Sequence, residues 1–187
     1  EDLDSTLNDL RSVPDPDEFF AQWQEKRLKI RDNILRQATN PDAQAILSRS
    51  LPEVLRQRQA KALTHGTKLY DEHTTATAMD TVSGIIRNAP EDRAGLIASD
   101  RDIQETLSAL LPIKGAEWVR AEGQRQLGDL YEQHATRQAF DNPVGLIQEL
   151  DGPNVYQRGL PKKEQQRLRE AAERRIDHLL VQQETER

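Results

Sequence analysis

The chain has 187 residues and a net charge of −6, with 35% hydrophobic, 4% aromatic and 31% charged residues. It has no cysteine, which excludes a disulfide framework, a thiolate nucleophile and a Cys-ligated zinc site. Its Lys and Arg residues alternate with Asp and Glu instead of forming a basic stripe, and no apolar run approaches the ~20 residues that span a bilayer, so we expect neither specific nucleic-acid binding nor a transmembrane segment.

The N-terminal part of the chain carries clear helix signals. Helices make the best use of few apolar residues, because each satisfies its own backbone hydrogen bonds and needs only a narrow apolar stripe. Residues 1–12 carry leucines at spacings of four and three, which predicts a short amphipathic helix. Asp15 and Pro16 are then a typical cap and first helical residue, and predict a helix to about Thr39.

The next start signals predict a short helix followed by a long one. Asn40-Pro41-Asp42 favours a helix start, and we expect that helix to end at Leu47. Ser50-Leu51-Pro52-Glu53 is a capping box that begins the long helix. No strong breaker follows until Pro90.

The second half of the chain also reads as helical. Residues 91–111 predict helical segments, with Ser99 or Asp100 capping the second. A turn over 112–115 leads into a long helix over 116–140. After a loop over 151–159, a final amphipathic helix is expected beyond Pro161.

One stretch of the chain is repeated further along it. Leu69–Ile86 aligns without gaps with Leu130–Ile147, and eight of eighteen positions are identical, where composition alone would give about one. In the second copy, Asp141-Asn142-Pro143 should end one helix and cap another, because proline disfavours a helical conformation in the residue before it. We therefore expect the first copy to kink or break near Asp80 as well, giving matching short helices over 81–88 and 143–150.

These patterns predict an all-α fold, an elongated antiparallel array of long helices built from two divergent repeats. We expect an N-terminal helical segment over 1–50, a first repeat over 51–111, and a second repeat with the C-terminal helix over 112–187. Within each repeat the long helix and the returning helix should pack antiparallel. The missing initiator Met and the shortened second repeat lead us to expect either a segment of a longer protein or a trimmed chain.

Two histidines occupy equivalent positions in the repeats. His73 and His134 each follow a tyrosine by three residues, Tyr70 and Tyr131, which places each pair on one helix face. One interpretation is a metal or proton-relay position, and the other is packing at a helix–helix seam. We favour the seam, because metal sites need several converging ligands. No metal or cofactor is predicted.

The repeated aspartates and the basic C-terminal stretch have ordinary structural interpretations. Asp80 and Asp141 could be catalytic carboxylates, but helix capping accounts for both. No nucleophile motif or glycine-rich phosphate loop occurs, so we predict no catalytic residue. The charged stretch Pro161–Arg175 favours a solvated helix face, with a phosphate- or lipid-headgroup-binding patch as the alternative.

The sequence resembles a known class of viral proteins. The resemblance lies in the cadence of Pro16 to Phe20, Arg31 to Leu35 and Asn40 to Asp42, followed later by Asp141-Asn142-Pro143 and by Leu160-Pro161 before a charged helix. This cadence is similar to the internal virion proteins of tailed bacteriophages and prophages. The resemblance implies a non-catalytic structural segment, internal to the particle or ejected with the genome. It transfers no catalytic residue.

The same resemblance implies partners and a location. The partners would be other virion proteins or further copies of this chain, and the location would be the phage particle, with delivery to the host cell envelope. The alternative function is a bacterial helical-repeat adaptor that binds a partner protein or peptide in a soluble compartment. An enzyme domain ranks below both, because no motif predicts a cleft with converging titratable groups.

Overall fold

The computed structural model describes residues 3–185, and every regular element within them is helical. The elements are α1 (Leu3–Leu10), α2 (Pro16–Gln37), α3 (Pro41–Arg87), α4 (Arg93–Ser108), α5 (Leu111–Lys114), α6 (Ala116–Asp141), α7 (Pro143–Leu150), the 3-10 helix η1 (Val155–Arg158) and α8 (Lys162–Thr185). The predicted all-α fold is confirmed. Across these described residues, no helix combines the length and apolarity needed to cross a membrane.

The chain divides into two compact units, Glu1–Ala76 and Thr77–Arg187, here called unit 1 and unit 2. This division differs from the segments expected from the sequence, which end at residues 50 and 111. The first of those ends falls inside α3, which continues through it without interruption. The second lies within unit 2, where the short helix α5 packs on α6.

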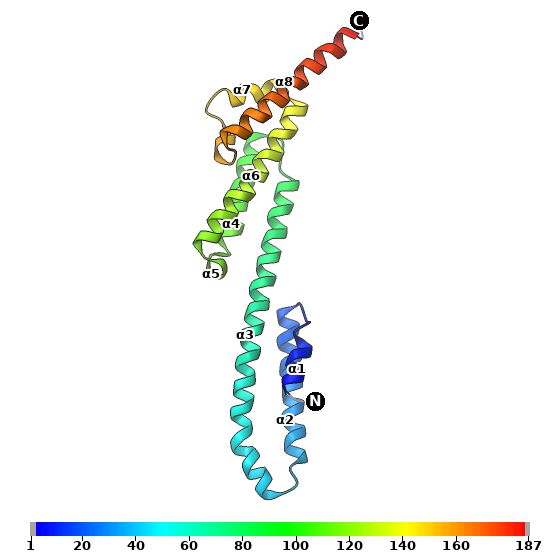
Figure 1. Ribbon diagram of the computed structural model, residues 1–187, viewed down its shortest axis with the longest axis vertical. Helices are drawn as coiled ribbons and strands as arrows, with labels where there is room; N and C mark the ends of the chain where they lie inside the picture. The colour runs from blue at the N-terminus through cyan, green and yellow to red at the C-terminus, as the bar shows by residue number, and fades with distance from the viewer. Residues whose placement is uncertain (1–2, 186–187) are drawn as a thin grey trace. The chain divides into compact units, whose positions relative to one another are not determined.

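Unit 1 is built around the aromatic residues of α2. Figure 1 shows α1 and α2 beside the first part of α3. Phe19 and Trp23 are fully buried, and the Trp23 indole donates a hydrogen bond of 2.9 Å to Gln59 of α3. A Cβ placed on Gly66 would meet the Phe20 ring. Phe20 thus meets a later residue of α3 than Trp23 does, so the two helices run antiparallel. The remaining buried residues of this core are Leu3, Leu7, Leu10, Ile30 and Ala62.

The start of α2 follows its sequence signal closely. Asp15 is the N-cap, and its carboxylate accepts hydrogen bonds from the backbone N–H groups of Asp17 and Glu18 at 2.9 and 3.0 Å. Pro16 occupies the first turn, where its missing N–H leaves no hydrogen bond unmade. The predicted helix start at this position is confirmed.

α3 is one uninterrupted helix of 47 residues, which corrects three predictions. The separate short helix ending at Leu47, the new start at Ser50 and the break near Asp80 are all absent from it. Ser50 donates its hydroxyl to the carbonyl of Ile46 at 3.1 Å instead of capping a new helix. At the expected break the chain has Thr81 and no proline, so nothing there prevents the helix from continuing.

The second copy of the repeated stretch does break, at the predicted place. α6 ends at Asp141, and α7 over Pro143–Leu150 confirms the predicted short helix. Asn142 caps α7 by accepting a hydrogen bond of 3.2 Å from the backbone N–H of Gly145. The two copies are therefore similar in sequence but different in local structure, because only the second has a proline.

α4 is a single helix rather than two segments. Its cap is Asp92, which accepts a hydrogen bond of 2.8 Å from the backbone N–H of Gly95. Ser99 and Asp100, predicted as caps, lie instead in the buried interior of α4, at 6% and 2% exposure. The turn predicted over 112–115 is largely the short helix α5.

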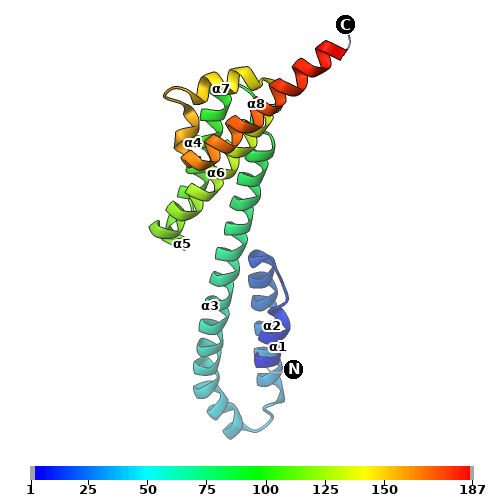
Figure 2. The same cartoon turned by 45° about the horizontal axis from the view of Figure 1, so that its top comes forward.

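α4 and α6 pack antiparallel in unit 2. Tyr131 of α6 hydrogen-bonds to Asp100, and His134, one turn further along α6, bonds to the carbonyl of Glu91, just before α4 begins. The later residue of α6 therefore meets the earlier residue of the α4 region, which makes the two helices antiparallel. Figure 2 shows the two helices side by side.

α8 instead runs parallel to α6, which corrects the predicted antiparallel pairing of the long and final helices. Glu132 pairs with Arg167, and Phe140, eight positions later in α6, contacts Arg175, eight positions later in α8. The parallel direction arises because α7, which packs against α8, first returns the chain across the unit (Figure 2).

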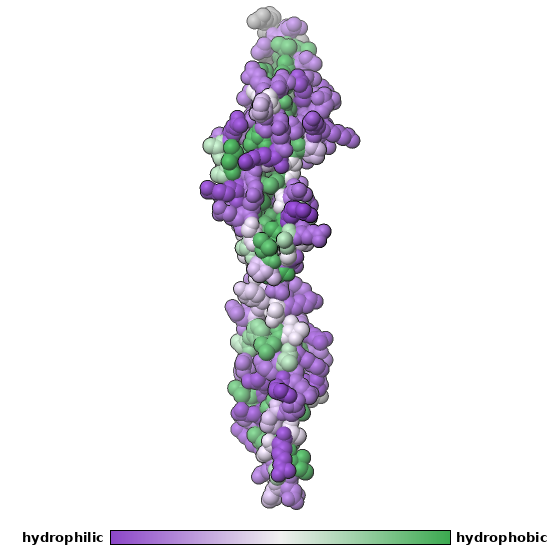
Figure 3. Space-filling model, turned by 90° about the vertical axis from the view of Figure 1, so that its left-hand side faces the viewer, coloured by the Kyte–Doolittle hydropathy of each residue, from purple (hydrophilic) through white to green (hydrophobic). Residues whose placement is uncertain are grey.

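The core of unit 2 is continuous and combines aliphatic side chains with two tyrosines. Its fully buried large side chains are Val82, Leu96, Ile103, Leu107, Leu110, Leu130, Tyr131, Leu146 and Tyr156. On the molecular surface, hydrophobic side chains form small patches within a mostly hydrophilic exterior, as Figure 3 shows for one face. The buried apolar residues are therefore concentrated where helices pack against one another.

Candidate interaction groove

His134 lies in the packed seam between α6 and its neighbours. Its ring is 6% exposed, and both nitrogens are hydrogen-bonded, Nδ1 to the Tyr156 hydroxyl and Nε2 to the Glu91 carbonyl, each at 2.9 Å. A carbonyl can only accept, so Nε2 carries the hydrogen and Tyr156 donates to Nδ1, a tautomer assigned from this network. Burial, and secondarily the charge of Glu149, raise the pKa of Tyr156, which keeps its hydroxyl a donor.

Tyr131 lies in the same seam and binds a buried carboxylate. Its hydroxyl donates a hydrogen bond of 2.6 Å to Asp100, and Gln104 donates to the other carboxylate oxygen. Arg158 of η1 lies 3.5 Å from the oxygen that Tyr131 binds. Burial raises the pKa of Tyr131, and the hydrogen bond to Asp100 raises it further.

These residues form one polar cluster that joins α4, α6 and η1. Asp100, Tyr156 and Arg158 were not identified from the sequence as members of it. The sequence predicts Asp100 as a candidate cap because acidic residues are common at helix starts, and it predicts a loop where Tyr156 lies. No local pattern in the sequence indicates that these residues meet.

The equivalent residues of the first copy do not pack in the same way. Tyr70 is 57% exposed and His73 is also exposed, both on the surface of α3, which corrects the prediction that they form a helix seam. In the second copy the seam exists because α4 and η1 cover one face of α6. The sequence match therefore preserves residue types without preserving their surroundings.

Neither repeated aspartate caps a helix. Asp80 lies inside α3, about two turns before that helix ends, so no free N–H groups are available to it. Asp141 is the last residue of α6, and the cap of α7 is the next residue, Asn142. Both aspartates are exposed.

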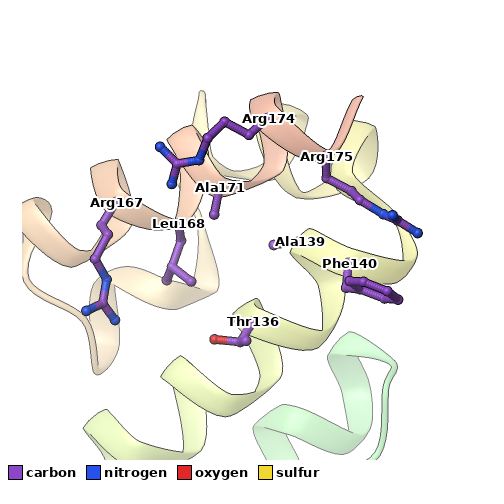
Figure 4. A pocket seen from close by; sticks show the side chains of 8 residues that line it. All are labelled: Thr136, Ala139, Phe140, Arg167, Leu168, Ala171, Arg174 and Arg175. Carbon is purple, nitrogen blue, oxygen red and sulfur yellow. The ribbon is translucent and has the colours of Figure 1, made fainter. Parts of the chain in front are cut away.

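An open groove of about 570 Å³ lies between α6 and α8. Its lining residues are Thr136, Ala139, Phe140, Arg167, Leu168, Ala171, Arg174 and Arg175, shown in Figure 4. Ala139 and Leu168 are buried at its floor, whereas Phe140 is 62% exposed. The volume lies within the range of about 300–1,000 Å³ that ligand pockets occupy.

All the charged residues that line this groove are arginines. Arg167 forms ion pairs with Glu132 and with Glu164, the latter at 3.0 Å. The Arg175 guanidinium lies over the face of the Phe140 ring, 4.1 Å from its centroid. Within residues 3–185, neither Arg174 nor Arg175 forms an ion pair with an acidic residue.

The stretch predicted as a solvated helix face therefore forms one wall of the groove. Leu168 and Ala172 of α8 are buried in the core of unit 2, and the groove arginines lie on either side of them along the same helix, at positions 167, 174 and 175. In the described part of the chain, no three His, Cys, Asp or Glu side chains come close enough together to hold a metal ion.

Comparisons with protein-family models, with curated proteins and with solved structures give no match to this chain.

Proposed function

We propose that this chain is a non-catalytic protein-interaction segment, and that it binds another protein in the groove between α6 and α8. The observation that carries this proposal is Phe140, a residue that is 62% exposed beside the buried Ala139 and Leu168. A large aromatic side chain at the edge of an apolar groove favours binding, because covering its surface removes apolar area from water. Each square ångström covered contributes about 25 cal/mol.

The polar cluster supports a structural rather than a chemical use of the seam residues. Both ring nitrogens of His134 and the hydroxyl of Tyr131 are engaged in holding α6 to its neighbours. Neither side chain lines the groove. A catalytic base would need to reach a substrate proton with a free nitrogen.

The setting that we propose is the virion of a tailed bacteriophage or prophage, internal or ejected with the genome. This setting rests on the sequence resemblance alone. The alternative is a bacterial helical-repeat adaptor for a protein or peptide. Exposed aromatic side chains in both copies of the repeated stretch, Tyr70 and Phe140, favour that alternative, whereas the buried Tyr131 counts against it.

The groove can be tested by site-specific crosslinking in the source organism. A photoreactive benzoylphenylalanine replaces Phe140, and in a control chain it replaces Leu111, which is 46% exposed on α5. We expect a discrete protein adduct from position 140 that position 111 does not give, and its loss when Ala171→Phe fills the groove. The proposal would be contradicted if positions 140 and 111 gave the same adducts, or if Ala171→Phe left the adduct from position 140 unchanged.

The virion setting needs a separate measurement. Quantitative mass spectrometry would compare purified phage particles induced from the source organism before and after triggered genome ejection. Depletion of this chain from emptied particles supports an ejected internal protein, and retention supports a fixed structural role in the particle. Complete absence from particles would remove the virion setting and leave the adaptor.

A further inference from the structure

We propose that the occupant of the α6–α8 groove is an acidic amphipathic helix of a partner protein. Its apolar residues would lie against Ala139, Leu168 and Ala171, and its carboxylates would bind Arg174 and Arg175. This inference rests on the proposed function of the groove and adds the chemistry of the segment that it binds.

The first argument is charge. The chain carries a net charge of −6, yet every charged residue that lines the groove is an arginine. Glu132 and Glu164 already balance Arg167. Two guanidinium groups remain without an acidic partner in the part of the chain that the structure describes, and both lie beside an apolar floor. An acidic partner would be attracted to this site and a basic one repelled.

The second argument is the pre-arrangement of Arg175. Its guanidinium is held over the Phe140 ring, and this cation–π contact restrains a side chain that would otherwise lose rotational freedom on binding. Its Nε is buried and has no hydrogen-bond partner among residues 3–185. A carboxylate of the partner would accept its hydrogen bonds from the Nη groups of this guanidinium while the guanidinium stays over the Phe140 ring.

The third argument is shape. The lining residues of α8 extend from Arg167 to Arg175, about two helical turns or about 12 Å. Figure 4 shows Ala139 and Ala171 facing each other between the arginines. Small residues at the floor let the backbone of a third helix approach closely, and the open form of the groove suits a helix laid along it.

An anionic bilayer is the competing partner, because arginines beside apolar residues also suit a lipid surface. The acidic residues of α8 disfavour binding to an anionic bilayer. Glu170, Glu173 and Asp177 are exposed on the same helix and would be repelled by anionic headgroups. None of these three carboxylates lines the groove, so a helix laid within it would meet fewer of them than a flat membrane surface would.

The test is a peptide selection against the full chain. A displayed library of 18-residue helices has leucine fixed at helical spacing and allows Glu, Gln or Lys at the flanking positions. We expect Glu to be enriched over Lys in the selected peptides. Their affinity should fall about tenfold or more in the double variant Arg174→Gln with Arg175→Gln, because charge-assisted hydrogen bonds are lost.

Matched variants separate the groove from the general surface. Arg101 of α4 and Arg125 of α6 are exposed and lie outside the groove, so the double variant Arg101→Gln with Arg125→Gln removes an equal charge and should leave peptide affinity unchanged. Ala171→Phe fills the groove without changing its charge and should abolish binding. Circular dichroism of each variant confirms that its helices are intact.

The outcomes distinguish the occupant from the site. Selection of neutral or basic peptides that Ala171→Phe still blocks would overturn the acidic occupant while supporting a binding groove. Peptides whose affinity is unchanged in every groove variant would overturn both the acidic occupant and the binding groove. Binding to phosphatidylglycerol vesicles that requires Arg174 and Arg175, with no preference for acidic peptides, would replace the partner helix with a membrane surface.

Discussion

Tyr131 of α6 donates its hydroxyl hydrogen to the buried carboxylate of Asp100 on α4, across 2.6 Å. Asp100 is 2% exposed, and a buried carboxylate is costly unless it is hydrogen-bonded. Arg158 approaches the same oxygen at 3.5 Å, from a side chain that is 60% exposed. Tyr131 is therefore a principal partner of Asp100, and the pair joins two helices at the centre of unit 2.

Replacing Tyr131 with phenylalanine removes this hydrogen bond and preserves the ring. We expect Tyr131→Phe to lower the free energy of unfolding by about 1–3 kcal/mol, the cost of leaving a buried polar group with a missing partner. Urea unfolding followed by circular dichroism measures the change. The control is Tyr70→Phe at the equivalent position of the first copy, which is exposed and should change stability by less than about 0.5 kcal/mol. Equal losses in the two variants would show that Asp100 does not depend on Tyr131.

The contrast between Tyr70 and Tyr131 shows what the sequence predicts and what it does not. Helix type, and most helix bounds, follow from local signals such as Asp15 before Pro16. The surroundings of a repeated residue depend on which other segments pack over it, and no local pattern encodes that. The helix breaks at Asn142 because Pro143 follows it, and α3 continues through Thr81 because no proline follows there. The break predicted for the first copy from the second was therefore wrong.

The glycines of the two copies give a second paired prediction. A Cβ at Gly84 of α3 would meet nothing within 4 Å, whereas a Cβ at Gly145 would lie 2.3 Å from the amide of Asn142. Gly84→Ala should raise the free energy of unfolding by about 0.5–1 kcal/mol, because alanine favours a helix. Gly145→Ala should lower it by about 1 kcal/mol, since displacing Asn142 loses the cap of α7. Thermal unfolding of both variants checks the opposite signs, and a gain in stability at both positions would contradict the role of the cap.

The groove was the part of the molecule least accessible from the sequence. The residues of α8 were visible as a charged amphipathic stretch, but the groove requires α8 to lie parallel to α6 with Arg175 over Phe140. That register is set by α7 and η1, which return the chain between the two long helices. Periodicity gives the faces of one helix and contains no information on the direction of its neighbour.

Adjacent alanines of α8 should respond differently to added volume. Ala172 is fully buried in the core of unit 2, whereas Ala171 lines the open groove. Ala172→Leu should lower the free energy of unfolding by about 1–3 kcal/mol through overpacking. Ala171→Leu should change it by less than about 0.5 kcal/mol, because the groove accommodates the larger side chain. Urea unfolding of the two variants tests the packing of α8, and equal destabilisation would show that position 171 is not open.

His65 of α3 should make the stability of unit 1 depend on pH. Its ring packs edge-on against Phe19, with centroids 5.0 Å apart, and its Nε2 is buried without a hydrogen-bond partner among residues 3–185. Burial lowers the pKa of His65, the charges of Arg11 and Lys68 lower it further, and Glu72 opposes them. The folded chain therefore binds a proton at His65 less readily than the unfolded chain does.

The sign of the pH effect follows from that difference. The contribution of neutral His65 is fully present above the unfolded value of about 6.5, and it is lost as pH falls towards the lowered folded pKa. We expect the free energy of unfolding of unit 1 to decrease between about pH 7 and pH 5, by no more than about 1.4 kcal/mol per pH unit for this one proton. Carboxylates titrate mainly below this window, near 4, so they contribute little to the slope.

The chain offers a direct way to observe unit 1 by itself. It has two tryptophans, and Trp23 is fully buried in unit 1, so Trp118→Phe leaves one fluorescent reporter in that core. Urea unfolding of this variant at several pH values gives the slope. His65→Gln should flatten the slope, because glutamine does not titrate, whereas His178→Gln at an exposed position of α8 should leave it unchanged. A slope that survives His65→Gln would assign the pH dependence to another group and show that burial of His65 has no measurable effect on folding.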